Sequence, residues 1–146
     1  LKPAAGDAAV AGSVALADER RAFDPELSVE KALRFWGAID GRSADHTRQV
    51  LGELGLDKLV QVPVRMLSTG QTKRAVAARA LQSGSDILLM DEPMNGLDQP
   101  SARAMAAAFE RRLAAGQTVI VASHIPIGIE PSTTLDMGTD AGEAQA

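Results

Sequence analysis

The stretch Ile87-Leu88-Leu89-Met90-Asp91-Glu92-Pro93 joins four apolar residues directly to two carboxylates and a proline. Four consecutive apolar residues predict a strand that is buried on both faces, as in a parallel sheet. Pro93 cannot continue the hydrogen-bond ladder, so the strand should end before it. Asp91 and Glu92 should then lie at the carboxyl end of the strand, where open α/β sheets place their ligands. Two carboxylates at that position fit either an acidic turn or a site that needs a metal ion or a proton acceptor.

The overall composition narrows the class of protein. The 146 residues suit one domain or part of one, and the 45% hydrophobic residues are enough for a packed core. The net charge of −4 gives no general attraction to nucleic acid, so no nucleic-acid partner is expected. The absence of cysteine excludes disulfides and thiolate metal sites. No apolar run approaches the roughly 20 residues that span a bilayer, so no membrane-spanning segment is predicted.

Hydrophobic periodicity and helix-capping residues predict that strands and helices alternate along the chain. Further strands are expected at 13–17 and 118–122, with a short last one at 135–138. The helix that begins at Ser28 has a predicted inward face made of Val29, Leu33, Phe35, Trp36 and Ile39. The other helices are expected at 43–54, at 69–81, and from Asp98 to Gly116. The strand–helix–strand order over 87–122 is that of a right-handed crossover unit in a parallel sheet.

These elements predict an α/β fold with a mostly parallel sheet and an inserted helical subdomain. The helical subdomain is assigned to 28–82, the sheet-bearing core to 83–138 and a flexible tail to 139–146. The aromatic pair Phe35 and Trp36 in the helical subdomain fits either core packing or contact with a partner.

The start of the helix at 69–81 is a candidate phosphate site. Ser68 and Gly70 would offer a hydroxyl, free N–H groups and the positive end of the helix dipole. An ordinary helix N-cap explains the same two residues, and the turn taken by itself favours that interpretation.

His124 follows the predicted strand at 118–122, on the sheet edge expected for Asp91 and Glu92. That position fits a catalytic histidine, although a lone histidine can also be purely structural. Asp98 fits a turn and a helix N-cap, and it can serve a second purpose in addition.

In their order along the chain, these groups resemble the motifs of the ABC-transporter ATPases. Leu67-Ser68-Thr69-Gly70-Gln71 resembles the signature motif, usually Leu-Ser-Gly-Gly-Gln, and 87–92 resembles the Walker B strand with its catalytic glutamate. The segment 95–98 resembles the D-loop, and His124 resembles the switch histidine. Within the family, the haem-exporter ATP-binding subunits of cytochrome c maturation are the most similar, on the stretches Pro25-Glu26-Leu27-Ser28-Val29, Leu33-Arg34-Phe35-Trp36, Ser123-His124-Ile125-Pro126-Ile127-Gly128 and Leu135-Asp136-Met137-Gly138.

The resemblance implies a P-loop NTPase domain that binds ATP and Mg²⁺ and pairs head to tail with a second ATP-binding subunit. It implies that Asp91 holds Mg²⁺, usually through water, that Glu92 activates the attacking water, and that His124 contacts the γ-phosphate. It further implies that Ser68, Gly70 and Gln71 face the nucleotide of the partner subunit and that Asp98 lies at the dimer interface.

The resemblance also implies integral membrane partner subunits and a peripheral location on the cytoplasmic face of the inner membrane. The implied activity is ATP hydrolysis for export, with haem as the cargo of the most similar subfamily. The helical region at 28–67, with Phe35 and Trp36, would face the membrane partners.

Three departures from the family pattern qualify these expectations. No Gly-x-x-x-x-Gly-Lys-[Ser/Thr] occurs, which predicts a C-terminal part of a longer ATPase, without the Walker A loop and inactive alone. The strands that flank 87–90 are then expected to be missing, which leaves sheet edges open. Arg20 stands where the family has a glutamine, and Thr69 replaces a glycine of the signature motif.

Two other classes of function remain open. A non-catalytic interaction module would bind a partner ATPase and offer only its signature motif. An ABC-type ATPase of DNA repair or translation fits less well, because the chain shows neither long insertions nor tandem domains.

Overall fold

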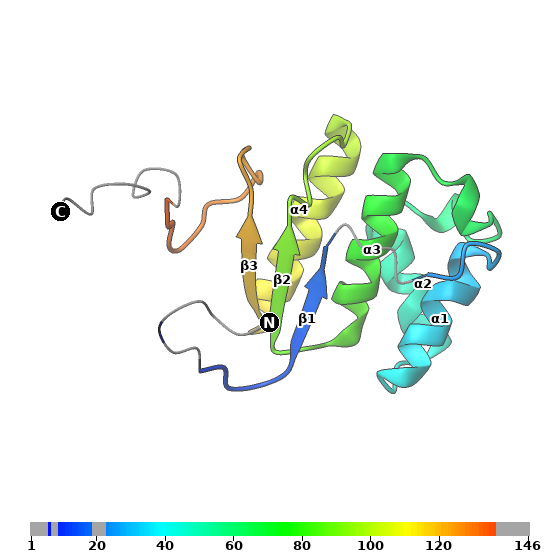
Figure 1. Ribbon diagram of the computed structural model, residues 1–146, viewed down its shortest axis with the longest axis horizontal. Helices are drawn as coiled ribbons and strands as arrows, with labels where there is room; N and C mark the ends of the chain where they lie inside the picture. Colours follow the sequence, from blue (N-terminus) through cyan, green and yellow to red (C-terminus); the bar gives the residue numbers. More distant parts are fainter. Residues whose placement is uncertain (1–5, 7–8, 19–22, 137–146) are drawn as a thin grey trace.

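The computed structural model describes residues 6, 9–18 and 23–136, and its centre is a three-stranded parallel sheet (Figure 1). The strands β1 (Val14–Ala17), β2 (Ile87–Asp91) and β3 (Thr118–Ala122) lie in the order β1-β2-β3. Ala17 lies beside Met90, and Ala122 lies beside Asp91. The expectation that the neighbours of 87–90 are missing is therefore wrong, because segments before and after β2 supply both of them.

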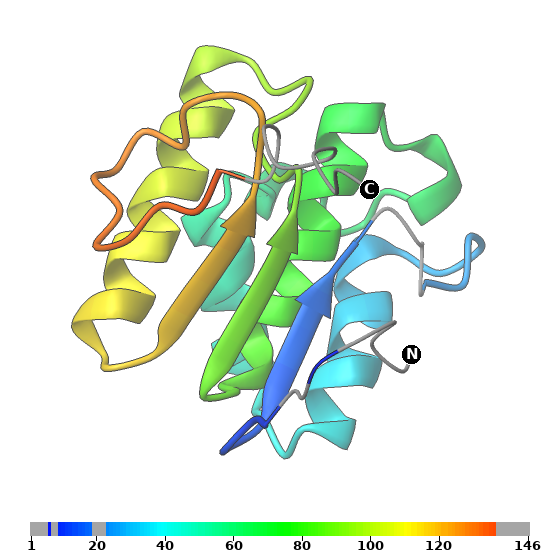
Figure 2. The same cartoon turned by 60° about the vertical axis from the view of Figure 1, so that its left-hand side comes forward.

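The helices that cover the sheet lie on one face of it (Figure 2). α3 (Thr69–Ser83) packs against β1, and α4 (Gln99–Ala114) packs against β3. Both crossovers run in the same direction across the sheet, and right-handed connections then place both helices on the same side.

The alternation of side chains along β2 follows from this one-sided cover. Leu88 and Met90 face the helices and are 0% and 2% exposed. On the opposite face, Leu16 of β1 is 50% exposed and Ile120 of β3 is 53% exposed. The expectation of burial on both faces is therefore wrong among the described residues, because no described helix covers the second face.

A group of short helices packs on the side of α3 that faces away from the sheet (Figure 1). It comprises α1 (Val29–Ile39), α2 (Ala44–Glu53) and two 3₁₀ turns, Asp57–Leu59 and Val64–Met66. Serine side chains cap both α-helices, as expected: Ser28 accepts a hydrogen bond from the Lys31 N–H, and Ser43 accepts one from the His46 N–H.

The inward face of α1 differs from the predicted one. Val29, Leu33 and the half-buried Trp36 contact the core, at the spacing of a single helical stripe. Phe35 and Ile39 are 58% and 61% exposed, so their assignment to the inward face is wrong. They lie on another side of the helix, and the rings of Phe35 and Trp36 pack nearly perpendicular to each other, with centroids 5.6 Å apart.

The remaining expectations concern the ends of the chain. Leu135 and Asp136 form no strand in the part of the chain that the structure describes. The described residues do not include Arg20, the last two residues of the strand expected at 135–138, or the tail at 139–146. Within the described ranges, no helix has both the length and the apolar character that crossing a bilayer requires.

Candidate active site

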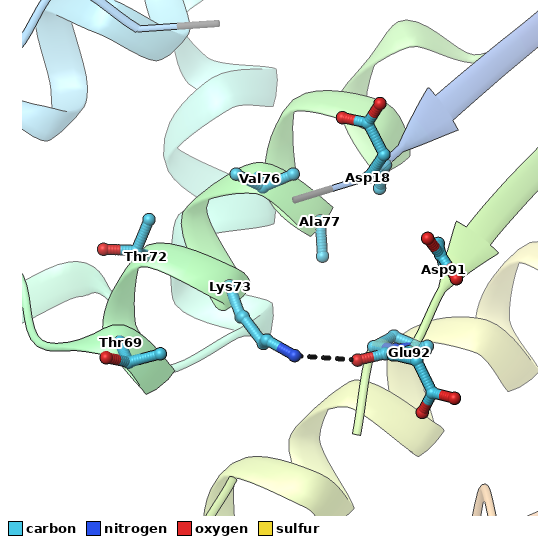
Figure 3. A pocket seen from close by; sticks show the side chains of 10 residues that line it. Asp18, Thr69, Thr72, Lys73, Val76, Ala77, Asp91 and Glu92 are labelled. Atoms are coloured by element: carbon cyan, nitrogen blue, oxygen red, sulfur yellow. Dashed lines mark hydrogen bonds between the residues drawn. The ribbon is translucent and has the colours of Figure 1, made fainter. Parts of the chain in front are cut away.

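Glu92 directly follows β2 and has a left-handed backbone, with φ at 45°. Left-handed φ is uncommon outside glycine and is maintained only where surrounding contacts enforce it. Two neighbours hold the peptide groups of Glu92. The Glu92 N–H donates to the Ala122 carbonyl at 2.9 Å, and the Lys73 Nζ donates to the Glu92 carbonyl at 3.2 Å (Figure 3).

The side chain of Glu92 meets His124, as the shared sheet edge predicts. The His124 Nδ1 lies 2.7 Å from the Glu92 Oε1. This hydrogen bond is the main cause that holds the pKa of Glu92 below its ordinary value of 4.5, and charge attraction from His124 and Lys73 adds to it. Glu92 is therefore ionised over the whole neutral range and can accept a proton from water.

The second carboxylate oxygen of Glu92 makes no hydrogen bond to His124. Oε2 is buried and has no hydrogen-bond partner among the described residues. A buried acceptor without a donor is costly, and such atoms are often found where a ligand or water supplies the missing bond. His124 is 65% exposed on its side chain, so the pair is accessible from solvent.

Asp91 is exposed, and its side chain points away from that of Glu92 (Figure 3). The two adjacent carboxylates can thus serve different atoms. No cluster of three or more potential metal ligands occurs in the described ranges. The single Asp91 carboxylate nevertheless fits Mg²⁺, which takes oxygen ligands and usually keeps several waters beside one or two carboxylates and substrate phosphates.

A cavity of about 210 Å³ lies between the carboxyl ends of β1 and β2 and the first turns of α3 (Figure 3). Asp91 and Glu92 line it from β2, and Thr69 and Lys73 line it from α3. Sequence analysis missed Lys73, although it lies three residues after Gly70 and hence on the same helix face. That spacing was the signal that could have identified it.

The signature turn, residues 67–71 at the start of α3, caps the helix. The Ser68 Oγ accepts the Gln71 N–H at 3.3 Å, and the Gln71 Oε1 accepts the Ser68 N–H at 2.9 Å. This reciprocal capping box confirms the N-cap interpretation. The Ser68 hydroxyl hydrogen is still available, because the oxygen acts only as an acceptor in this arrangement.

Gly70 and Asp98 connect this turn to the segment after β2. A Cβ on Gly70 would lie 3.4 Å from the Gly96 carbonyl oxygen, so the two loops are in contact. The Asp98 carboxylate caps α4 by accepting the Ser101 N–H at 2.9 Å. The hydrogen bonds from Ser101 are the main cause that lowers the pKa of Asp98.

The predicted site residues thus form two groups. Asp91, Glu92 and His124 meet at the carboxyl ends of β2 and β3. Ser68, Gly70 and Gln71 lie at the N-terminus of α3, where Gly70 approaches the turn before Asp98. Among the described residues, no hydrogen bond joins Ser68 or Gln71 to Glu92 or His124.

The chain is similar to known proteins over most of its length. The family model for ABC transporters matches residues 5–95. The cytochrome c biogenesis ATP-binding export protein CcmA of Novosphingobium aromaticivorans is 46% identical over 135 residues, which cover 92% of this chain and 68% of that protein. The protein of the same name from Sphingopyxis alaskensis is 41% identical over 138 residues, which cover 94% of this chain and 71% of that protein.

The fold is also shared with solved structures. A dimeric ATP-binding cassette in a post-hydrolysis state, bound to ADP and Pi, matches with a TM-score of 0.70 and 20% identity, over 77% of this chain and 53% of that chain. At this identity the likeness concerns the fold alone. The chain spans about two thirds of the two curated relatives and about half of the solved cassette.

Proposed function

The chain belongs to the ABC transporter family, and from this premise we propose that it is the ATP-binding and ATP-hydrolysing subunit of an export complex. The observation that carries the proposal is the 2.7 Å contact between Glu92 and His124 at the carboxyl end of the sheet. It joins an ionised carboxylate to a histidine that orients it, and the Oε2 of that carboxylate has no partner within the residues that the structure describes. Such a group can orient a water molecule and take its proton.

In the proposed reaction, Glu92 accepts the proton of the water that attacks the γ-phosphate. His124 keeps the carboxylate in place through Oε1 and presents its exposed ring to the phosphate. Asp91 would hold Mg²⁺, which when bound neutralises charge on the phosphates. Closure of the site then excludes bulk water.

The second half of the site comes from a partner subunit in this proposal. Two ATP-binding subunits meet head to tail, and Ser68, Gly70 and Gln71 of one face the γ-phosphate bound to the other. The dipole at the N-terminus of α3 and the spare Ser68 hydroxyl hydrogen suit a phosphate. Asp98 lies at the dimer interface. Residues 1–146 contain no Walker A motif, so we expect no ATP turnover from them alone.

The process and the membrane partners are inferred from the names of the relatives and from the exposed apolar side chains of α1. Because the curated relatives are named for cytochrome c biogenesis and export, we propose a role in that process, with haem as cargo. The subunit would sit peripherally on the cytoplasmic face of the inner membrane. The exposed Phe35 and Ile39 would contact integral membrane subunits from the helical subdomain at 28–82.

The first test compares Glu92→Gln with Glu110→Gln in the protein as its gene encodes it. Both variants remove one carboxylate charge, but Glu110 is an exposed residue of α4, far along the chain from the site. Loss of a general base should lower ATP turnover by about a hundredfold or more in Glu92→Gln, with ATP binding retained. Glu110→Gln should turn over ATP like the wild type.

Normal turnover in Glu92→Gln would contradict the role of Glu92. A protein that never hydrolyses ATP but binds a separate ATPase through its signature turn would favour the alternative, a non-catalytic interaction module. The absence of a Walker A motif from the 146 residues is the observation that keeps this alternative in view.

A further inference from the structure

We propose that Lys73 is a positioning residue that fixes Glu92 and links it mechanically to the signature turn of the same chain. The inference rests on the proposed ATPase function, and it concerns a residue outside the signature, Walker B and switch-histidine motifs. Its basis is the hydrogen bond from the Lys73 Nζ to the Glu92 backbone carbonyl, at 3.2 Å (Figure 3).

The backbone conformation of Glu92 needs external support. Its φ of 45° makes it the only described residue other than glycine with a left-handed backbone. Such a conformation costs roughly 1–3 kcal/mol and persists where neighbouring contacts over-determine it. The carboxylate direction depends on this backbone, because a change in φ swings the side chain away from His124.

The contacts that provide this support come from three sides. β3 holds the Glu92 N–H through the Ala122 carbonyl at 2.9 Å. The following turn contributes the Asn95 N–H, which donates to the Glu92 carbonyl at 3.3 Å. Lys73 adds a charged donor to the same carbonyl, and hydrogen bonds of this kind are stronger than neutral ones.

The charge of Lys73 also attracts the Glu92 carboxylate, so it acts on the same residue that its hydrogen bond holds. The Lys73 side chain is part-buried in the cavity, and within the described ranges it forms no salt bridge. A surface lysine used only for solubility would keep its ammonium group in water. Here the ammonium group is held on a backbone carbonyl, which indicates a positioning role.

Lys73 connects the signature turn to Glu92. It lies three residues after Gly70, one turn into α3, so it moves with the signature turn. In a head-to-tail dimer that turn faces the nucleotide of the other site, whereas Glu92 acts at its own. Lys73 would thus pass a shift of the signature turn at one site to the catalytic carboxylate at the other.

The test measures ATP hydrolysis by the full-length protein with its partner subunits, for the wild type, Lys73→Met and Lys73→Arg. Methionine keeps an unbranched stem but cannot donate, whereas arginine can donate to the same carbonyl. Lys58→Met is the matched control, because Lys58 is exposed on the 3₁₀ turn at 57–59. The melting temperature of each variant shows that it is folded.

We expect kcat to fall about tenfold in Lys73→Met with little change in KM, because a misplaced base slows the chemical step without loosening ATP. Lys73→Arg should recover most of the loss, and Lys58→Met should behave like the wild type. An unchanged kcat in Lys73→Met, a change confined to KM, no recovery in Lys73→Arg, or an equal loss in Lys58→Met would each overturn the inference.

Glu92→Gln, measured in parallel, separates this inference from the proposed function. A wild-type protein that hydrolyses ATP and a silent Glu92→Gln variant support the function, even where Lys73→Met proves fully active. In that case only the proposed role of Lys73 is contradicted. A wild-type protein without turnover overturns both.

Discussion

The two ends of β2 each carry a carboxylate with a lowered pKa, but the surroundings of the two carboxylates differ. At the amino end, Asp86 accepts the Ser13 N–H at 2.7 Å and the Ser13 hydroxyl at 2.8 Å, and its own N–H donates to that hydroxyl at 3.0 Å. At the carboxyl end, Glu92 meets a histidine and has a left-handed backbone, and one of its buried oxygens has no hydrogen-bond partner in the described part of the chain.

This difference shows why a shifted pKa alone does not identify a site. Hydrogen bonds from Ser13 lower the pKa of Asp86, and these bonds fasten β1 to β2. The hydrogen bond from His124 lowers the pKa of Glu92, and histidine can itself gain or lose a proton near neutrality. Purely structural interactions also shift pKa values, so the identity of the partner and the backbone conformation are needed to tell a functional carboxylate from a structural one.

The largest effect beyond Glu92 itself is expected from His124→Ala. Loss of the Nδ1 contact frees the carboxylate, and turnover should fall by roughly ten- to a hundredfold at neutral pH. The pKa of Glu92 should then rise toward its ordinary value of 4.5, because the main cause of its lowering is gone. A base must be ionised to act, so the acid limb of the pH–rate profile should move to higher pH.

His46→Ala is the matched control for this measurement. His46 is the only other histidine of the chain, and its Nε2 contacts the Gln82 carbonyl at the far end of α3. It should leave both the turnover and the acid limb unchanged. If the acid limb does not move in His124→Ala, then His124 does not control the ionisation of Glu92. The proposed difference between the carboxylates at the two ends of β2 would be contradicted.

A smaller effect, on stability alone, is expected from Asp86→Ala. At neutral pH the melting temperature should fall by about 3–5 °C, because the two hydrogen bonds that the Asp86 carboxylate accepts from Ser13 disappear. The pKa of Asp86 is lower in the folded chain than its ordinary value of 3.8, so its contribution is present above that value and is lost as the pH falls through the folded pKa.

The melting temperatures of wild type and Asp86→Ala should therefore converge in strong acid. Asp57→Ala, which removes an exposed carboxylate from a 3₁₀ turn, should change little at any pH. ATP turnover per folded molecule should be unchanged in Asp86→Ala. If Asp86→Ala lowers turnover but not stability, then Asp86 is not a purely structural carboxylate, and the proposed difference between the two ends of β2 is contradicted.

Much of this molecule could be predicted from its sequence. The three strands, the four α-helices and their caps at Ser28, Ser43, Ser68 and Asp98 follow from local signals: apolar runs, helical periodicity and short polar side chains before a helix. The meeting of Glu92 with His124 also followed, because parallel strands bring their carboxyl ends to one edge.

What could not be predicted depends on tertiary placement. A continuous apolar run does not say how many faces of a strand are covered, and the direction of both crossovers left Leu16 and Ile120 exposed. The apolar residues of α1 did not reveal that Phe35 lies off the buried stripe. The hydrogen bond of Lys73 goes to a backbone carbonyl, which no pattern of side chains encodes.

The most direct test of the account is the nucleotide found in the Glu92→Gln protein after incubation with ATP and Mg²⁺. The variant is separated by size, and the bound nucleotide is identified and counted. We expect a dimer that holds two molecules of unhydrolysed ATP, because the signature turns close on the phosphates while the base is missing. Bound ADP, or a variant that stays monomeric with ATP, would contradict the claim that Glu92 is the base of a site shared by two subunits.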